Sequence, residues 1–196
     1  TVRSGLRPDI LHTRLHGAFV HIAERSDFGF IMHDATRIDL AASANVYRDQ
    51  HANWLQRVAI EAAFLSRLRP DLVLTDVAYL PLAGAAQAGI PSFSLCSLNW
   101  ADLFAHYFSD EPWATSIHRE MLAAYNSAEC FLRLTPGMPM NDFNRVHAIA
   151  PVASLGQDRR SELRERLRCP PDEKIVLIAF GGIEKRLPVD GWPAVS

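Results

Sequence analysis

The chain has 196 residues, 48% of them hydrophobic and 21% charged, which fits one large globular domain or one domain with part of another. A formal net charge of −2 and the lack of a long basic run argue against nucleic acid as a partner. No apolar stretch reaches the roughly 18 residues of a membrane span. Three widely spaced cysteines argue against a disulfide framework or a zinc knuckle and favour a cytoplasmic location.

The amino-terminal third of the sequence predicts two short strands and then a long helix. A strand remnant is expected at residues 1–5, and a short strand at 18–24, where apolar and polar residues alternate. Residues 26–39 are of mixed polarity and predict a loop. Apolar residues spaced by three and four then predict a helix over residues 40–68, long enough to allow a break near His51.

Beyond Pro70, which ends that helix, short apolar runs alternate with helical patterns. Strands are expected at residues 71–76, 90–97, 129–135, 145–153 and 174–182. Helices are expected between them at residues 79–89, 100–108, 111–128 and 158–169. This alternation predicts an α/β fold with a Rossmann-like parallel sheet and flanking helices. A second Rossmann-like domain is expected to begin near residue 153, with 174–182 as its first strand.

Polar side chains stand where two of the predicted strands end. Asp76 ends one strand, and Asn99 and Trp100 follow the next. Ligands of open parallel sheets bind outside the carboxyl ends of the strands. We therefore expect Asp76 and Asn99 to hydrogen-bond sugar hydroxyls and Trp100 to stack on a sugar face. The alternative is structural, because Asn99 can cap the helix that follows it and Trp100 can pack on the core.

Four segments of the sequence carry a family resemblance: "LRPDLVLTDVAYLPLAGAAQAGIPS", "CSLNWADLFAHY", "FLRLTPGMPM" and "PVASLGQDRRSELRERLRCPPDEKIVLIAFGG". Their order and spacing resemble the glycosyltransferase-like domain of predicted bacterial glycosyltransferases and the amino-terminal part of plant arabinokinase-type proteins. The resemblance implies the GT-B architecture, in which two Rossmann-like domains face a cleft. It assigns residues 1–152 to the acceptor-side domain, without its first strand, and 153–196 to a linker helix and the start of the donor-side domain.

The resemblance also implies how a nucleotide-sugar donor is held. Gly181 and Gly182 follow the first strand of the donor-side domain and would approach the donor diphosphate, because glycine has no Cβ to obstruct backbone N–H groups. Neither a metal nor another cofactor is demanded, since helix N-termini and basic groups can stabilise a leaving diphosphate.

The loop at residues 26–39 supplies the candidates for a catalytic base. Asp27 or His33 could take the proton of an acceptor hydroxyl, because long loops at strand ends often carry function. His12 and His16 have helical spacing, but no HExxH motif accompanies them, so no metal site is predicted there.

The expected function is sugar transfer from a nucleotide-diphosphate donor to an acceptor hydroxyl. The first residue is Thr1 rather than Met and the last residues read as a helix cut short, so the chain is expected to be a fragment that is inactive by itself. The alternative is a non-catalytic sugar- or nucleotide-binding or interaction module. A sheet edge bared by the missing strand would also let two copies pair as a homodimer.

Overall fold

The computed structural model describes the chain except for residues 27, 180–184, 189–190 and 193–196. The chain divides into two compact units, which are described separately. Unit 1 comprises Thr1–Ile31 and Leu40–Pro151, and unit 2 comprises Met32–Asp39 and Val152–Ser196. The assignment of residues 1–152 and 153–196 to an acceptor side and a donor side stays a prediction.

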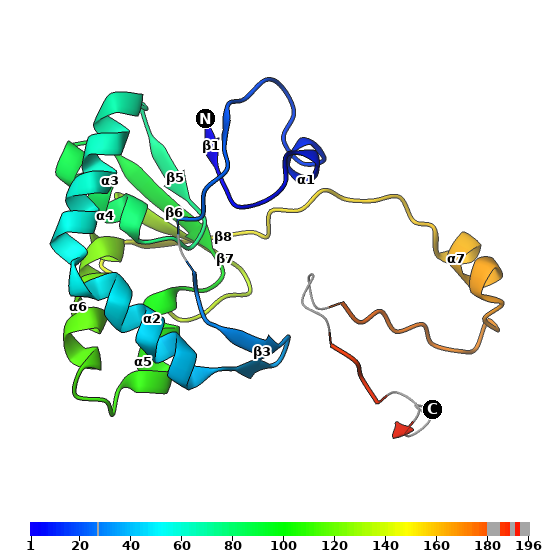
Figure 1. The fold of residues 1–196 in the computed structure, drawn as a ribbon. Helices are drawn as coiled ribbons and strands as arrows, with labels where there is room; N and C mark the ends of the chain where they lie inside the picture. The colour runs from blue at the N-terminus through cyan, green and yellow to red at the C-terminus, as the bar shows by residue number, and fades with distance from the viewer. Residues whose placement is uncertain (27, 180–184, 189–190, 193–196) are drawn as a thin grey trace. The chain divides into compact units, whose positions relative to one another are not determined.

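A four-stranded parallel sheet forms the centre of unit 1 (Figure 1). Its strands are β5 (Val73–Thr75), β6 (Ser92–Cys96), β7 (Cys130–Leu134) and β8 (Val146–Ile149), and they lie side by side in that order. Helices connect β5 to β6 and β6 to β7, whereas the connection from β7 to β8, residues 135–145, contains no helix. The predicted Rossmann-like α/β fold is confirmed.

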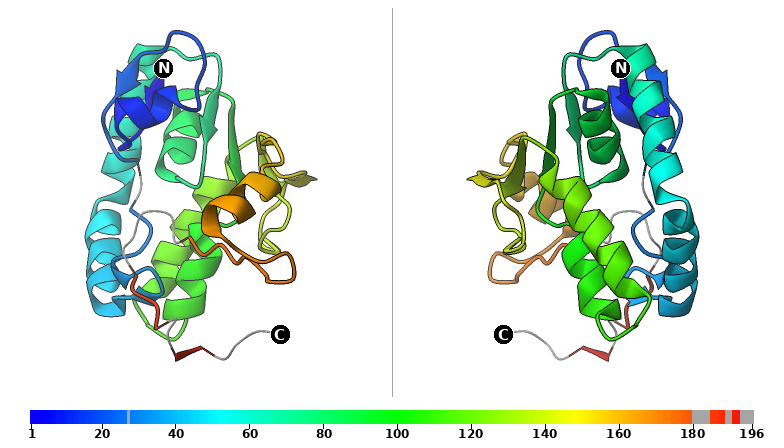
Figure 2. Two further views of the ribbon diagram at one scale, coloured as in Figure 1. Left: turned by 90° about the vertical axis from the view of Figure 1, so that its right-hand side faces the viewer. Right: turned by 90° about the vertical axis from the view of Figure 1, so that its left-hand side faces the viewer.

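Five helices of unit 1 flank this sheet: α2 (Leu40–Ala52), α3 (Trp54–Leu68), α4 (Leu80–Ala88), α5 (Trp100–Phe108) and α6 (Ala114–Asn126). The expected long helix is broken at Asn53, which has φ −125° and ψ 42°, and its two parts run end to end in Figure 2. Pro81 lies in the first turn of α4, and Gly89 ends this helix with φ 68°. Both residues do what their position in the sequence predicts.

An aromatic core holds the helices together. Tyr47 of α2 lies at its centre, with ring centroids 4.6 Å from Phe28 and 4.7 Å from Phe104, both in edge-to-face geometry. Aromatic pairs of this kind contribute about 0.5–1.5 kcal/mol beyond the area they bury. Leu82 and Met121 are fully buried in the same cluster. The core therefore joins helices that are distant in sequence.

The amino-terminal part of unit 1 forms a second, two-stranded parallel sheet. It contains β1 (Val2–Arg3), α1 (Pro8–His12) and β2 (His21–Ile22). The Val2 N–H donates to the Val20 carbonyl at 2.8 Å, and the Ser4 N–H donates to the Ile22 carbonyl at 3.1 Å. The strands predicted at 1–5 and 18–24 are thus present in shortened form.

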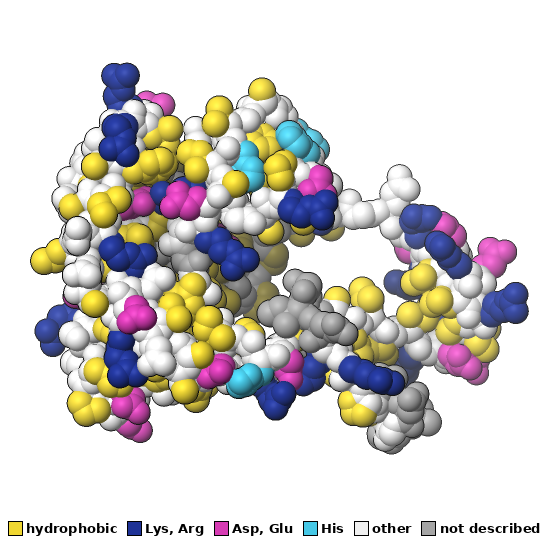
Figure 3. All heavy atoms as spheres, in the orientation of Figure 1, with side chains coloured by type: hydrophobic (Ala, Val, Ile, Leu, Met, Phe, Trp, Pro, Cys, Tyr) yellow, Lys and Arg dark blue, Asp and Glu magenta, His cyan; other side chains and the backbone are white. Residues whose placement is uncertain are grey.

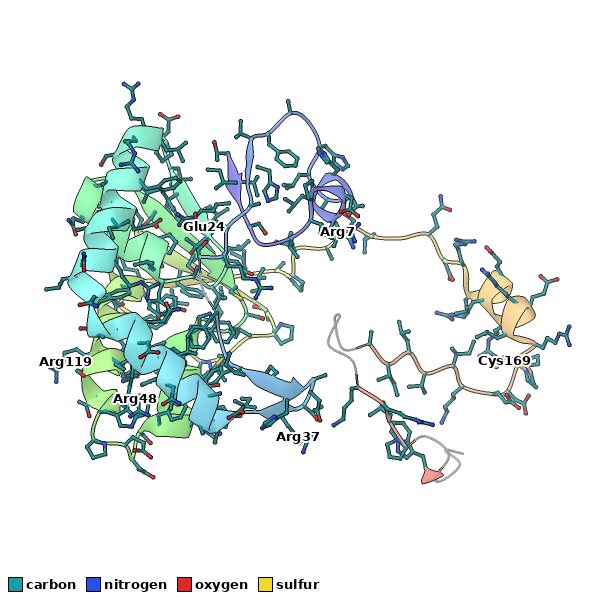
Figure 4. The ribbon with its side chains drawn as sticks, viewed as in Figure 1. Arg7, Glu24, Arg37, Arg48, Arg119 and Cys169 are labelled. Carbon is teal, nitrogen blue, oxygen red and sulfur yellow. The ribbon has the colours of Figure 1, made fainter. Side chains whose placement is uncertain are left out.

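Unit 2 contains a hairpin and one polar helix. The hairpin is β3 (Met32–Asp34) paired antiparallel with β4 (Arg37–Ile38), inside the region predicted to be a loop. The helix is α7 (Arg160–Leu167), which has no buried residue. Figure 4 labels Arg37 on the hairpin and Cys169 just beyond α7.

The strand predicted at residues 174–182 is wrong for its described part, because residues 174–179 form no strand, and residues 180–182 lie outside the described residues. A strand exists through hydrogen bonds to a neighbour, and in the part of the chain that the structure describes no strand pairs with this stretch. Its apolar side chains are consequently exposed, and Leu177 is 89% exposed. An apolar pattern indicates that a segment can be buried, but burial also requires neighbouring elements that pack against it.

Candidate functional site

The carboxyl ends of β5 and β6 bring an acid and a thiol together. Asp76 directly follows β5 and is exposed, and Cys96 is the last residue of β6. The Ser94 hydroxyl donates to the Asp76 backbone carbonyl at 2.5 Å, which fixes the turn after β5. Burial raises the pKa of the Cys96 thiol, and the neighbouring Asp76 carboxylate raises it further, although backbone hydrogen bonds from Leu98 and Ser97 oppose this. A thiol with a raised pKa is protonated at neutral pH and can donate a hydrogen bond.

The loops after β6 and β7 are tied together beside this pair. The Met138 N–H donates to the Ser97 carbonyl at 2.8 Å. A Cβ on Gly137 would lie 2.9 Å from the same carbonyl oxygen and 2.4 Å from the Leu134 carbonyl oxygen, so only glycine fits there. The Arg133 guanidinium donates to the Pro139 carbonyl at 3.0 Å. These contacts fix the backbone of the loops that follow β6 and β7 at the carboxyl end of the sheet.

Asn99 has a structural role. It is fully buried, and its side-chain oxygen accepts from the Asp102 N–H at 2.8 Å, so it caps α5. A role for Asn99 in sugar binding stays a prediction. The capping alternative, which the sequence left open, is the one that the structure shows.

Trp100 is partly buried and packs within unit 1. Its ring lies 6.0 Å from that of Phe30, and a Cβ on Gly29 would lie 2.8 Å from it. Its backbone N–H donates to the Tyr125 hydroxyl at 3.1 Å, and this hydroxyl donates to the Val77 carbonyl at 2.6 Å. These bonds connect the loop after β5 to the start of α5, and they hold Trp100 near the same edge as Asp76.

Of the two candidate bases and the two glycines, the structure describes His33 alone. Asp27, Gly181 and Gly182 lie outside the described residues. His33 belongs to β3 of unit 2, where its Nε2 lies 3.6 Å from the Asp39 carboxylate and its ring is half exposed. A catalytic role for Asp27 or His33 stays a prediction.

Two polar networks escaped the sequence analysis. In unit 2, the Asp34 carboxylate accepts from the Thr36 N–H at 2.9 Å, from Arg37 at 2.8 Å and from Lys185 at 3.0 Å. These bonds, that of the Thr36 N–H first, hold the pKa of Asp34 far below its usual range. The sequence "DATR" signals the local turn, but nothing in it signals Lys185, which is 151 residues away.

The second network is buried in unit 1. His51 Nδ1 lies 2.7 Å from a Glu120 carboxylate oxygen, and its Nε2 lies 2.8 Å from the Tyr79 hydroxyl. Burial lowers the pKa of His51 although Glu120 opposes this. The ring also stacks on Trp54 at 4.8 Å. His51, Trp54 and Glu120 come from α2, α3 and α6, and Tyr79 precedes α4. Because these residues meet only in the folded chain, no local sequence pattern could have indicated the network.

Several classes of site are not found in the described ranges. No group of three or more His, Cys, Asp or Glu side chains there could hold a metal ion. Among the same residues, no helix is both long and apolar enough to cross a bilayer. Basic and acidic side chains are interspersed over the face that Figure 3 shows, without a field of one sign.

A known plant protein is similar to this chain in sequence. The chain is 28% identical to the L-arabinokinase of Arabidopsis thaliana over 160 residues, which cover 80% of this chain and 15% of the plant protein. The chain thus spans less than a sixth of the length of this curated relative. No family model matches the chain, and no solved structure matches it.

Proposed function

We propose that unit 1 binds a sugar at the carboxyl ends of β5 and β6, as the acceptor-side domain of a glycosyltransferase. One observation carries the proposal: an exposed carboxylate, Asp76, stands at the edge of a parallel sheet where ligands of this fold bind. A carboxylate accepts hydrogen bonds from two neighbouring hydroxyls of a sugar. The Cys96 thiol and backbone groups of the tied loops complete a surface with both donors and acceptors.

The proposed chemistry is the transfer of a sugar from a nucleotide-diphosphate donor to an acceptor hydroxyl. Asp76 would orient the acceptor, and Trp100 would cover one face of its ring. Asp27 or His33 would take the hydroxyl proton as the acceptor oxygen attacks the anomeric carbon. The nucleoside diphosphate would leave towards Gly181 and Gly182, whose backbone N–H groups can bind its charge.

A non-catalytic sugar-binding module is the second candidate. The name of the plant relative supports it, because an arabinokinase acts on a sugar without being a glycosyltransferase, and the match covers 15% of that protein. In both candidates the carboxyl ends of β5 and β6 bind the sugar. They differ in whether a nucleotide-sugar donor is consumed.

Calorimetric titration with L-arabinose and a panel of nucleotide-diphosphate sugars tests the shared part. Asp76→Asn keeps the shape of the side chain and removes its charge, and we expect it to weaken sugar binding about tenfold, the loss of one charge-assisted hydrogen bond. Asp71→Asn is the matched control, because Asp71 is another exposed aspartate and lies before the amino end of β5 rather than at its carboxyl end. Equal affinities of both variants and the unmodified chain would contradict the assignment.

Turnover separates the two candidates. The complete natural polypeptide that contains this chain is incubated with each nucleotide-diphosphate sugar and candidate acceptors, and release of nucleoside diphosphate is measured. Release that depends on an acceptor supports the transferase. Sugar binding without release supports the non-catalytic module.

A further inference from the structure

An arginine lies beside Cys96 at the carboxyl end of the main sheet. β6 and β7 pair in parallel, and their register sets Cys96 opposite Arg133. Side chains of such a pair lie on the same face of the sheet, and the two strands are about 4.8 Å apart. Asp76, which neighbours the Cys96 thiol, follows β5 on the other side of β6. An acid, a thiol and a guanidinium therefore stand on three adjacent strands at the same end of the sheet.

The loop after β7 holds the Arg133 side chain in place. Its Nη1 donates to the Pro139 carbonyl at 3.0 Å and to the Met138 carbonyl at 3.4 Å. A Cβ on Gly137 would lie 3.2 Å from Cγ of Arg133, so the loop also packs closely on the aliphatic part of this side chain. Neutral carbonyl groups orient the guanidinium but do not cancel its charge. Arg133 thus presents a fixed positive charge, and Arg133 is partly buried.

The guanidinium of Arg133 retains donors on the side away from Nη1. A guanidinium has five N–H groups and no acceptor, so the Nε–H and the two N–H groups of Nη2 remain. In the part of the chain that the structure describes, none of these groups has a hydrogen-bond partner and no carboxylate pairs with Arg133. Arg3, by contrast, is paired with Glu61. Nε and Nη2 together form the fork that binds two oxygens of a carboxylate or phosphate.

We propose that Arg133 binds an anionic group, a carboxylate or a phosphate, on the sugar that the carboxyl end of the sheet receives. The inference rests on the proposed function, in which Asp76 binds ring hydroxyls of the same sugar. The ligand class is therefore uronates and sugar phosphates rather than neutral sugars, and Arg133 is the residue that sets this specificity.

The order of the charges fixes how such a sugar lies. Asp76 and Arg133 are two strand spacings apart, about 10 Å across the sheet. A hexose with a charged group on its exocyclic carbon spans this distance, with ring hydroxyls at Asp76 and the anion at Arg133. The reverse orientation places two negative charges together at Asp76, which is unfavourable. The pair of opposite charges thus selects both the ligand class and its orientation.

Titration with inorganic phosphate at constant ionic strength tests the anion site without any sugar. The NMR signal of the Arg133 Nε–H, assigned by its loss in Arg133→Gln, is followed. We expect a saturable shift with a Kd on the order of 1 mM. Arg119 of α6, labelled in Figure 4, is the matched control, because it is exposed and has no partner among the described residues. Equal shifts of both signals, or the same shift of the Arg133 signal with chloride, would overturn the proposal.

Calorimetric titration with D-galactose, D-galacturonate and D-galactose 6-phosphate tests the ligand class, because these sugars differ only at the exocyclic carbon. We expect one or both charged sugars to bind the unmodified chain about tenfold more tightly than D-galactose, the gain of one charge-assisted hydrogen bond. Arg133→Gln should abolish this difference and leave the affinity for D-galactose within about twofold. Arg119→Gln should change none of the three affinities. The two charged sugars distinguish a carboxylate site from a phosphate site.

Two further results separate this proposal from a structural role of Arg133 and from the proposed function itself. Arg133→Lys keeps the charge without the fork and should retain part of the preference for charged sugars. An equal loss of affinity for all three sugars in Arg133→Gln would show that Arg133 acts only on the loop, and would overturn the proposal. If phosphate shifts the Arg133 signal but none of the three sugars binds, the proposed sugar site is wrong, whereas the anion site at Arg133 stands.

Discussion

β5 and β6 are adjacent strands with apolar sequences, yet their surroundings differ. β6 has a partner on each edge, whereas the described residues give β5 a partner on one edge only. The polar Ser94 of β6 is fully buried, while the apolar Leu74 of β5 is largely exposed. How far a side chain of a parallel strand is buried therefore depends on the elements packed around that strand, and not on whether the side chain is polar.

The largest loss of stability is expected in the aromatic core, which is the well-packed part of unit 1. Phe104 of α5 is fully buried and packs against Tyr47 and Trp113. Phe104→Ala should lower the free energy of unfolding by about 3–5 kcal/mol, because the cavity it leaves cannot collapse fully. Urea denaturation measures this value.

Tyr107→Ala in the same helix is the control. Tyr107 is 39% exposed, so Tyr107→Ala should lower the free energy of unfolding by less than about 1 kcal/mol, apart from the difference in helix propensity between the two residues. Similar losses for both variants would mean that the aromatic core is looser than the structure shows.

The next largest effect is expected where α4 meets α3. A Cβ on Gly84 would lie 2.4 Å from Cγ of Glu61, the residue that holds Arg3. Glycine to alanine in a helix usually stabilises by about 1 kcal/mol. Gly84→Ala should instead destabilise by about 1–3 kcal/mol, because Glu61 has to move from its bond with Arg3.

Thermal denaturation of Gly84→Ala and Gly156→Ala checks this contact. A Cβ on Gly156 meets nothing within 4 Å, so its variant should leave the Tm unchanged. A rise in Tm for Gly84→Ala would show that α3 and α4 are not in close contact at Glu61.

A smaller effect is expected just after β6, at the cap of α5. Asn99→Ala removes the acceptor for the Asp102 N–H and should cost about 1 kcal/mol. Asn99→Ser keeps a capping oxygen and should recover most of that loss. If both variants retained full stability but lost sugar binding, Asn99 would be a ligand residue after all.

The smallest expected effect is a change in pH dependence at His51. Because burial lowers the pKa of folded His51 below its unfolded value of 6.5, the unfolded chain binds more protons as the pH falls through that value. The stability that neutral His51 contributes is therefore present above pH 6.5 and is lost as the pH falls towards the folded pKa. Urea denaturation of the chain and of His51→Gln between pH 7.5 and about 5 compares the two slopes. The variant should have the flatter slope, and equal slopes would contradict the effect.

The sequence by itself determined the features that rest on local chemistry. The alternation of apolar runs and helical patterns predicted the α/β fold. The helix predicted at 79–89 is present as α4, with Pro81 at its start and Gly89 at its end, because the backbone preferences of both residues are intrinsic. Asp76 could be placed at the end of a strand for the same reason, since strand ends follow from the apolar pattern.

The tertiary structure alone decided which of these features meet. His51 and Glu120 are 69 residues apart, and no periodicity links them. Asn99 fitted both a ligand site and a helix cap in the sequence, and only the structure shows that it is buried and caps α5. The sequence predicted strands at 1–5 and at 71–76, but nothing in it indicated the contact between Arg3 and Glu61 of α3. Such outcomes depend on distant residues packing together, which a local pattern does not encode.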